Sequence, residues 1–280
     1  MTVYLDPNPT KDEELEITRQ AAALLCNFGV RVLIADRYSD QPIRGAVYLP
    51  AVSGIQQADA VVTVGGDGTL LRAASKCVDA GKPLLGINLG RTGFLATCEV
   101  QQMENKLWRL ARGDYQLEQR SLLKATCDSA SWRTMAVNDI VLYGKSRQHP
   151  MDYIVTCDGV FVCRFRSDGV ILATPTGSTA YSLSAGGPVL DVTAPVFVLN
   201  AICPHGIHIA PLVFSGKRRI CITSAEENRD EVLVSADSLS SCILAPGNTV
   251  EVQIAERALP FIAFDSAEQF RAIENKLARR

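Results

Sequence analysis

The 280-residue sequence has three histidines, no general excess of basic residues and no long apolar run. No stretch approaches the roughly 20 consecutive apolar residues that a membrane-spanning helix requires, so we expect no membrane partner. Lys and Arg together number 28 against 30 Asp and Glu, and this balance gives no electrostatic reason to expect a nucleic-acid partner. The first residues lack the basic flank and apolar core of a secretory signal.

Cysteine is present nine times, an odd number, but no two cysteines have C-x-x-C spacing. The sequence therefore indicates neither a zinc site nor a redox pair. We expect reduced, mostly buried thiols and a cytoplasmic protein. His205 and His208 lie three residues apart, but no carboxylate or cysteine pattern supports them as metal ligands. Apolar residues make up 47% of the chain, which is long enough for about two folded domains.

Strand-like and helix-like segments alternate over residues 1–112. Apolar runs at 3–5, 30–34, 60–64 and 83–87 predict strands, and the segments between them have helical spacing of apolar residues. Strands separated by helices are typical of right-handed crossovers and a parallel sheet. We therefore predict an α/β domain over this range, with ligands bound at the carboxyl ends of its strands.

Short strands separated by turns dominate from residue 113 onward. They predict a mainly β domain over 113–265, built as two stacked sheets or as a barrel. A final helix is expected over 266–280, with Phe270, Ile273 and Leu277 on one face, packing back on the N-terminal domain. The strands expected in the β domain cover 122–127, 135–143, 153–157, 160–165, 170–173, 220–223, 232–234 and 250–254.

Gly65-Gly66-Asp67-Gly68-Thr69 lies between a predicted strand and a helix-like stretch from Leu70 to Ala80. Glycines let a backbone approach phosphate closely, and the first N–H groups of a helix attract anions. The Asp67 carboxylate in this turn can serve phosphate chemistry as a metal ligand or as a base. Asp-Gly is also a hairpin signal, but the helical spacing that follows, ended by Gly81, favours the phosphate turn.

Two polar segments interrupt the β half. Thr174 to Thr179 is rich in hydroxyl groups and glycine, which suit ribose and phosphate oxygens; equally, Ser178 or Thr179 could simply cap a helix. Asn138-Asp139 interrupts an apolar stretch. This pair is consistent with a bulge or a solvent-exposed face, and also with an amide and a carboxylate that contact a nucleotide.

Together these segments resemble the NAD kinase family. The resemblance covers most of the chain: the glycine turn 65–69, the loop 86–95, the pair 138–139, the run 168–188 and Cys203-Pro204-His205. The turn alone is shared with lipid kinases of the diacylglycerol and sphingosine type and is related to one in phosphofructokinases. The run from Asp168 to Pro188 is much more specific to the NAD kinases.

The resemblance implies roles for individual residues. Asp67 corresponds to the catalytic base, and Mg²⁺ is implied as the cofactor, with no protein ligand assigned to it. The phosphates of ATP are expected at Gly65, Gly66, Gly68 and Thr69. The residues implied in NAD binding are Asp67, Gly68, Arg72, Asn138, Asp139, Arg166, Asp168, Thr179, Ala180, Tyr181 and Ser184.

The implied reaction transfers the γ-phosphoryl group of ATP, or a phosphoryl group of polyphosphate, to the adenosine 2′-hydroxyl of NAD. The resemblance also implies a homodimer or homotetramer, with the dinucleotide held in a cleft between the two domains. A lipid kinase would instead need an apolar acceptor pocket. A non-catalytic NAD or NADP sensor is the remaining alternative, and an assay for NADP formation separates it from an enzyme.

The sequence departs from the family pattern at several positions. Asp139 stands where the family usually has glutamate, which is one methylene longer. Thr92 replaces a leucine, the segment 206–211 differs from the usual serine- and arginine-containing one, and Leu239 replaces a glutamine. These departures concern contacts to NAD, and we expect the core reaction to survive them.

Overall fold

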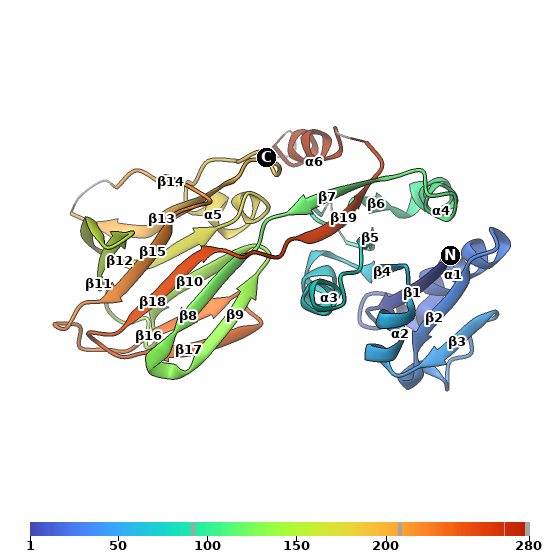
Figure 1. The fold of residues 1–280 in the computed structure, drawn as a ribbon, viewed down its shortest axis with the longest axis horizontal. Helices are drawn as coiled ribbons and strands as arrows, with labels where there is room; N and C mark the ends of the chain where they lie inside the picture. Colours follow the sequence, from blue (N-terminus) through green and yellow to red (C-terminus); the bar gives the residue numbers. More distant parts are fainter. Residues whose placement is uncertain (91–92, 207–208, 266, 278–280) are drawn as a thin grey trace. The chain divides into compact units, whose positions relative to one another are not determined.

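The computed structural model describes residues 1–90, 93–206, 209–265 and 267–277, with side chains up to Glu274 in the last range. The chain forms two compact units (Figure 1). Unit 1 contains Met1–Gln119 together with the chain from Leu259 onward, and unit 2 contains Arg120–Ala258. The α/β fold expected for the N-terminal half and the mainly β fold expected for the rest are both confirmed.

Unit 1 is built on a mostly parallel sheet with the strand order β3-β2-β1-β4-β5-β19-β7, and β6 pairs with β5. Every residue of β4 is buried, so both faces of this central strand are covered, as is usual for a parallel sheet. The strands are β1 (Thr2–Pro7), β2 (Arg31–Ala35), β3 (Ala46–Leu49), β4 (Ala60–Gly65), β5 (Leu84–Asn88), β6 (Cys98–Glu99), β7 (Gln116–Arg120) and β19 (Leu259–Ala263).

The helices of unit 1 pack in pairs, α1 with α4 and α2 with α3. Helix α3 begins within the glycine turn, at Asp67, and ends at Ala80, followed by Gly81, whose φ of 64° suits glycine. The strand–turn–helix prediction is thus confirmed and the hairpin interpretation is wrong. The helices are α1 (Glu16–Asn27), α2 (Ala51–Gln57), α3 (Asp67–Ala80), α4 (Met103–Ala111) and α6 (Glu268–Leu277), with 3-10 turns η1 (Glu13–Leu15), η2 (Asp36–Tyr38) and η3 (Val100–Gln102).

Unit 2 is an antiparallel sheet with the path β17-β16-β10-β12-β11-β15-β18-β8-β9, to which β13 and β14 add beside β12. Strand β8 contacts β10 and β9 contacts β16, so the two ends of the path face each other around one core. The strands are β8 (Leu123–Cys127), β9 (Trp132–Ala136), β10 (Asp139–Gly144), β11 (Met151–Cys157), β12 (Val160–Ala173), β13 (Val196–His205), β14 (Leu212–Ser215), β15 (Arg219–Ser224), β16 (Val232–Ala236), β17 (Ser240–Leu244) and β18 (Thr249–Ile254); η4 (Asp128–Ala130), η5 (Gly177–Thr179) and α5 (Tyr181–Ser184) lie between them.

The unit boundaries differ from the predicted domains 1–112, 113–265 and 266–280. Residues 259–263, which the prediction assigned to the β domain, form strand β19, which pairs in parallel with β5 through Phe261 and Leu84 and therefore belongs to unit 1. Strand β7 extends the same sheet beyond β19. These pairings join segments far apart in the sequence, so no local pattern indicated them.

Several strands also differ from the sequence prediction. The single strand expected over 135–143 is split into β9 and β10, while the two runs 160–165 and 170–173 form one strand, β12. Strands β3, β6, β7, β13, β14, β17 and β19 were not predicted. Helix α6 is present, but Phe270 is 57% exposed where the prediction placed it on the packed face, and Ala272 is buried instead.

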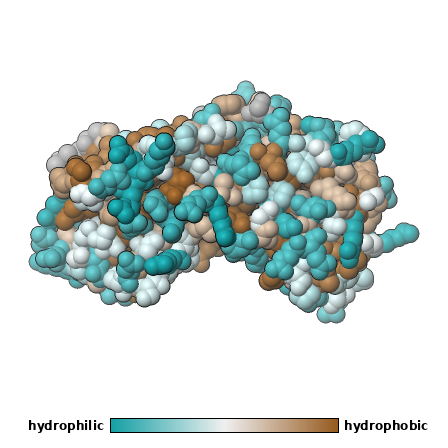
Figure 2. All heavy atoms as spheres, viewed as in Figure 1, coloured by the Kyte–Doolittle hydropathy of each residue, from teal (hydrophilic) through white to brown (hydrophobic). Residues whose placement is uncertain are grey.

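No helix in the described part of the chain is long and apolar enough to cross a membrane. All nine cysteines are free thiols. Figure 2 shows hydrophilic and hydrophobic residues interspersed over the visible surface of each unit.

Helix α6 is tied to α4 by an ion pair with little exposure to solvent. Nζ of Lys106 lies 2.6 Å from Oε1 of Glu268 and also donates to the carbonyl of Thr97 at 2.9 Å. The two charged side chains are only 10% and 11% exposed. Arg109 adds a hydrogen bond to the carbonyl of Phe264, at the end of the chain leading into the helix.

We expect Glu268→Ala to loosen helix α6, because it leaves the Lys106 ammonium buried without its carboxylate. Breaking a buried ion pair in this way costs about 3–5 kcal/mol. The variant should melt at a lower temperature and be cleaved faster by protease after residue 265. Glu274→Ala, an exposed glutamate of the same helix, is the control. Equal cleavage rates in the two variants would contradict a stabilising role for the pair.

Candidate functional site

The loops that follow β1, β4 and β5 meet at the glycine turn of unit 1. Nδ2 of Asn8 donates to Oγ1 of Thr69 at 2.9 Å, and the N–H of Leu89 donates to the carbonyl of Gly65 at 2.6 Å. A Cβ on Gly65 would lie 2.4 Å from Oγ1 of Thr69, so only glycine fits there. Gly66 precedes the first turn of α3 in an extended conformation. The turn therefore presents its backbone amides from a fixed position.

The Asp67 carboxylate accepts three backbone hydrogen bonds from one loop. Oδ2 accepts from the N–H of Phe94 at 3.0 Å, and Oδ1 accepts from Leu95 at 3.2 Å and Ala96 at 3.0 Å. A Cβ on Gly93 would lie 2.4 Å from Oδ1, so the chain passes close over the carboxylate. Two carboxylate oxygens offer about four acceptor positions, so one remains for a substrate hydroxyl. No local sequence pattern indicated this loop-ordering role.

The side chains around the turn are arranged on the same end of α3. Thr69 is buried, and its hydroxyl oxygen accepts from NH2 of Arg72 at 3.3 Å as well as from Asn8. Arg72 and Gly68 are exposed. Of the residues predicted near phosphate, the structure therefore brings Gly65, Gly66, Gly68, Thr69 and Arg72 together with Asp67.

Asn138 and Asp139 lie at the tight turn between β9 and β10, held by a carboxylate that sequence reasoning did not assign to the site. Oδ2 of Asp237 accepts from the N–H of Val137 at 2.7 Å, and its Oδ1 accepts from Asn138 at 2.8 Å and Asp139 at 3.1 Å. Asp237 and Ser238 have φ of 49° and 57°, a conformation that non-glycine residues rarely adopt. Because these three N–H groups donate to Asp237 and not to a neighbouring strand, strand β9 ends here and no continuous strand forms over 135–143.

The hydroxyl-rich turn of the 168–188 run packs directly on this pair. Oγ1 of Thr174 donates to the carbonyl of Val137 at 2.6 Å, and the N–H of Thr174 donates to that of Asn138 at 2.9 Å. A Cβ on Gly177 would lie 2.0 Å from the Asn138 carbonyl oxygen, so the two backbones touch. Two segments whose contacting residues Val137 and Thr174 are 37 positions apart in the sequence thus form one site within unit 2.

Three polar side-chain atoms in and around this turn have no hydrogen-bond partner. Within the described residues, Oδ1 of Asn138, Oγ1 of Thr176 and Oγ of Ser182 are buried and accept or donate no hydrogen bond. A buried polar atom left without a partner costs about 1–3 kcal/mol, so such atoms mark a place where a polar ligand would be stabilised. Thr176 and Ser182 were not among the predicted site residues.

The helix-cap interpretation of this segment is wrong. Neither η5 nor α5 has a side-chain cap. Instead, Oγ of Ser178 donates to the carbonyl of Pro175 at 2.6 Å and Oγ1 of Thr179 donates to that of Thr176 at 3.1 Å. These hydroxyls fix the shape of the turn that leads into Ala180, Tyr181 and Ser184.

Asp168 and Tyr181 line a cavity of about 250 Å³ in unit 2, together with Tyr143, Arg147, Gln148, His149, Pro150 and Ile202. Asp168 lies on β12 and is about half exposed; its Oδ1 is 3.4 Å from Nε2 of His205. Arg166, two positions earlier on the same strand, is exposed. Asp168 is therefore a surface carboxylate beside a cavity, and its ion pair with His205 is exposed to solvent.

Of the remaining departures from the family pattern, the structure describes some and not others. Leu239 is 54% exposed at the turn between β16 and β17. Thr92 and the residues 207–208 of the altered segment lie outside the described residues, so the expectation for His208 has no structural counterpart. In the described part of the chain, no three His, Cys, Asp or Glu side chains are placed to hold a metal ion.

Asp139 is a buried carboxylate, 8% exposed, close to a second buried carboxylate. Burial and, as the smaller cause, the charge of Asp237 together raise the pKa of Asp139 to about 7. Burial also raises the pKa of Asp237, while its three backbone N–H bonds oppose that effect. Asp139 is thus the member of the pair that holds a proton near neutral pH.

Comparison with family models and with known proteins identifies the family to which the chain belongs. The model of the ATP-NAD kinase N-terminal domain matches residues 50–115, and that of the ATP-NAD kinase C-terminal domain matches residues 137–264. The NAD kinase of Gemmatimonas aurantiaca is 36% identical over 225 residues, covering 78% of this chain and 77% of the relative. The chain belongs to the NAD kinase family.

Other NAD kinases extend this similarity over the whole chain. The NAD kinase of Chlorobium phaeobacteroides is 31% identical over 272 residues, covering 96% of this chain and 94% of the relative. A crystal structure of yeast NADH kinase complexed with NADH superposes with a TM-score of 0.86 and 26% identity, covering 99% of this chain and 87% of that one. An Archaeoglobus fulgidus NAD kinase in complex with ATP gives a TM-score of 0.78 at 26% identity, with full coverage of both chains.

We expect Asp139→Asn to stabilise the fold much more at pH 8 than at pH 5. Above about pH 4 the unfolded chain loses the Asp139 proton, whereas the folded chain keeps it up to about pH 7, so this residue lowers stability as pH rises through that window. An asparagine stays neutral and removes the penalty, by up to about 4 kcal/mol for a shift of about three units. Melting temperatures at the two pH values measure it.

Asp237→Asn is the matched control, because it removes an acceptor of the backbone N–H groups. It should lower the melting temperature at both pH values. If Asp139→Asn gave the same change at pH 5 as at pH 8, Asp139 would be ionised throughout and the assignment of the proton would be wrong.

Proposed function

We propose that this NAD kinase family member transfers the γ-phosphoryl group of ATP to the adenosine 2′-hydroxyl of NAD, giving NADP and ADP. The observation that carries the proposal is the Asp67 carboxylate at the start of α3. It lies among the amides of the glycine turn and keeps an acceptor position after binding the loop Phe94–Ala96. A base and a set of anion-binding donors are thus in one place.

The acceptor side supports a polar substrate. The unpartnered atoms of Asn138, Thr176 and Ser182 are buried hydrogen-bonding groups, which suit a dinucleotide and would be left unpaired by an acyl chain. The lipid-kinase alternative requires an apolar acceptor pocket and is therefore not favoured. Asp168 and Tyr181 line the cavity of unit 2, and we propose that these two contact NAD together with Arg166, Thr179, Ala180 and Ser184.

In the proposed reaction Asp67 accepts the proton of the 2′-hydroxyl as its oxygen bonds to the γ-phosphorus. The bond from that phosphorus to the bridging oxygen of ADP breaks in line with the attack. Phosphoryl transfer depends on positioning and charge stabilisation more than on covalent catalysis. The amide of Gly68 and the Arg72 guanidinium are groups available to stabilise charge on the phosphate oxygens, whereas the N–H of Thr69 already donates to the carbonyl of Gly66.

Mg²⁺ is proposed as the companion of ATP. Mg²⁺ in kinases is usually held by phosphate oxygens, water and one or two carboxylates, so an absence of a protein cage among the described residues is compatible with it. Asp67 would be the protein carboxylate nearest the phosphates, and the ion would neutralise phosphate charge. A homodimer or homotetramer in the cytoplasm, and polyphosphate as a second donor, are further parts of the proposal.

Formation of NADP from ATP and NAD, followed by a coupled assay, tests the function directly. We expect Asp67→Asn to lower kcat by about 10²–10⁴-fold, the usual contribution of a general base, with little change in the KM for NAD. If Asp67 mainly holds the metal, added Mg²⁺ or Mn²⁺ should restore most of the rate.

Gly93→Ala is the control for the role of Asp67 in ordering the loop Phe94–Ala96. Its Cβ would displace the loop over the carboxylate without removing the base. A kcat loss in Gly93→Ala as large as in Asp67→Asn would show that loop order explains the defect. Near-normal turnover of Asp67→Asn at saturating substrates would exclude both the base role and the metal-binding role of Asp67.

We expect Asp168→Ala to raise the KM for NAD about 10- to 100-fold, the loss of one hydrogen bond to a charged group, and to leave the KM for ATP unchanged. The exposed pair with His205 contributes about 0–1 kcal/mol, so the variant should stay folded. His205→Ala breaks the same pair but keeps the carboxylate, and its KM for NAD should change much less. Equal weakening toward both substrates would contradict the assignment.

A further inference from the structure

The segment 93–97, three of whose amides bind Asp67, also contacts helix α6 through its last residue. Oγ1 of Thr97 donates to Oε2 of Glu268 at 3.3 Å, and the Thr97 carbonyl accepts from Nζ of Lys106 at 2.9 Å. Nζ of Lys106 in turn lies 2.6 Å from Oε1 of Glu268. The ion pair that ties α6 to α4 therefore also holds the segment that orders the Asp67 carboxylate.

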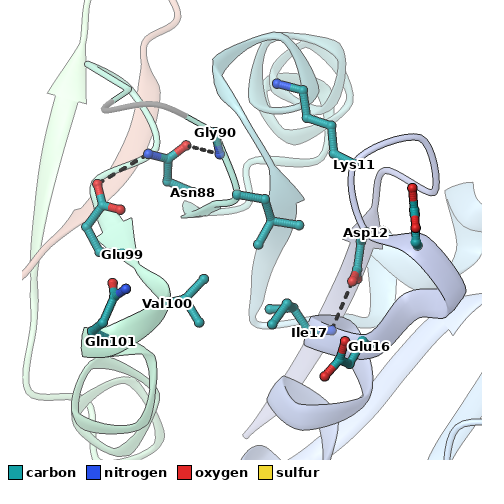
Figure 3. Close-up of a pocket in the computed structure, with 11 residues that line it drawn as sticks. Lys11, Asp12, Glu16, Ile17, Asn88, Gly90, Glu99, Val100 and Gln101 are labelled. Carbon is teal, nitrogen blue, oxygen red and sulfur yellow. Dashed lines mark hydrogen bonds between the residues drawn. The ribbon is translucent and has the colours of Figure 1, made fainter.

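The start of the same loop is fixed within unit 1 as well. The side chain of Asn88, at the end of β5, lies between Gly90 and Glu99 (Figure 3). Its Nδ2 donates to Oε1 of Glu99 at 3.2 Å, and its Oδ1 accepts from the N–H of Gly90 at 3.0 Å. Glu99 belongs to β6, which pairs with β5. The chain therefore leaves the sheet at a fixed place, and the contacts of Thr97 fix the other end of the loop.

The segment 93–97 packs closely against the sheet but has free space toward α4 and α6. A Cβ on Gly86 of β5 would lie 2.9 Å from Cβ of Ala96, so the segment has no room to move toward that strand. A cavity of about 180 Å³ is lined by Gly93 and Thr97 together with side chains of α4 and α6. The segment can therefore move into this cavity, and the contacts of Thr97 with the ion pair oppose that movement.

Apolar packing gives helix α6 little hold on unit 1. Among its side chains that the structure describes, only Ala272 is buried, and Phe270 is 57% exposed. The start of the helix is set by a polar contact instead, because the carbonyl of Asp265 accepts from the N–H of Glu268 at 3.2 Å. Glu268 thus lies in the first turn, where its carboxylate meets Lys106. Helix α6 therefore acts on the loop through the side chain of Glu268.

We propose that Glu268 is a positioning residue for phosphoryl transfer, which holds Lys106 against the loop and so keeps Asp67 in its ordered orientation. The inference rests on the proposed function for the role of Asp67 as the base. Without the Glu268 charge, the Lys106 ammonium is buried and unpaired, so it turns toward water and releases the Thr97 carbonyl. The loop then moves into the cavity, and Asp67 loses hydrogen bonds that fix its direction toward the 2′-hydroxyl.

Turnover of full-chain variants, measured well below their melting temperatures, tests this inference. Glu268→Gln keeps the shape of the side chain and removes its charge. It should lower kcat about 10- to 100-fold, the scale for a small displacement of a catalytic group, and leave the KM values for NAD and ATP unchanged. Leu33→Ala is the control, because it removes buried apolar contacts of β2, which β1 and β4 separate from β5. Its kcat should be normal, and an equal loss of kcat in Leu33→Ala would overturn the proposal.

A double-mutant cycle separates positioning of the base from a general loss of stability. If Glu268 acts through Asp67, Glu268→Gln should change kcat by less than about twofold in the Asp67→Asn background. Independent effects multiply, so equal fold losses in the two backgrounds would contradict a positioning role. Thr97→Val removes only the hydroxyl that donates to Glu268 and should give a smaller loss of kcat in the same direction. This variant decides the question if Glu268→Gln does not fold, and a normal kcat in it would then overturn the proposal.

Amide hydrogen exchange followed by NMR measures the order of the loop without catalysis. The N–H groups of Phe94, Leu95 and Ala96 should exchange at least about 10-fold faster in Glu268→Gln than in the wild type, while those of β2 stay unchanged. A wild type that forms no NADP, with this faster exchange in Glu268→Gln, would overturn the proposed function and support the coupling of α6 to the loop. A wild type that forms NADP, with unchanged kcat and exchange in Glu268→Gln, would overturn the inference and leave the function standing.

Discussion

Each unit holds its functional loop by one carboxylate that accepts three consecutive backbone N–H groups. In unit 1, Asp67 binds the amides of Phe94, Leu95 and Ala96; in unit 2, Asp237 binds those of Val137, Asn138 and Asp139. Strand ends leave such amides without sheet partners, and a buried amide without a partner is costly. A carboxylate with several acceptor positions satisfies three at once, so the position of each loop depends on a single side chain.

This arrangement combines structure and proposed chemistry in one residue. Asp67 orders a loop and, in the proposed reaction, accepts a proton with the acceptor position that remains. Asp237 leaves Asn138 with a buried, unpartnered Oδ1 and places Asp139 where burial raises its pKa to about 7. The strained φ angles of Asp237 and Ser238 and the protonated Asp139 lower stability locally. Such costs are typical of sites where the fold holds polar groups ready for a ligand.

The parallel sheet of unit 1 explains why the phosphate-binding groups converge. Strands β1, β4 and β5 run in the same direction, so the loops after all three emerge at one edge. Asn8 and Leu89 bind the glycine turn from the two neighbouring loops. Lys11 therefore lies next to Gly66, although the two residues are 55 positions apart in the sequence. The cation at the turn follows from the strand order.

The sequence by itself determined the elements that depend on interactions between residues close together in the chain. The run 60–64, the glycines at 65, 66 and 68 and the helical spacing after them specify strand, turn and helix, because glycine geometry and apolar periodicity act over a few residues. The motif from Asp168 to Pro188 likewise identified the family. The interruption of an apolar stretch by Asn138-Asp139 was visible in the sequence, but the place of this pair at a turn was not.

Tertiary structure alone decided the contacts between distant segments. Strand β19 joins unit 1 because its edge pairs with β5, and β9 ends where Asp237, about a hundred residues later, captures the backbone. The loop bound by Asp67 and the placement of Lys11 arise in the same way. Hydrogen bonds of this kind depend on which strands become neighbours, and that choice is made by burial of the whole core, which no short stretch of sequence contains.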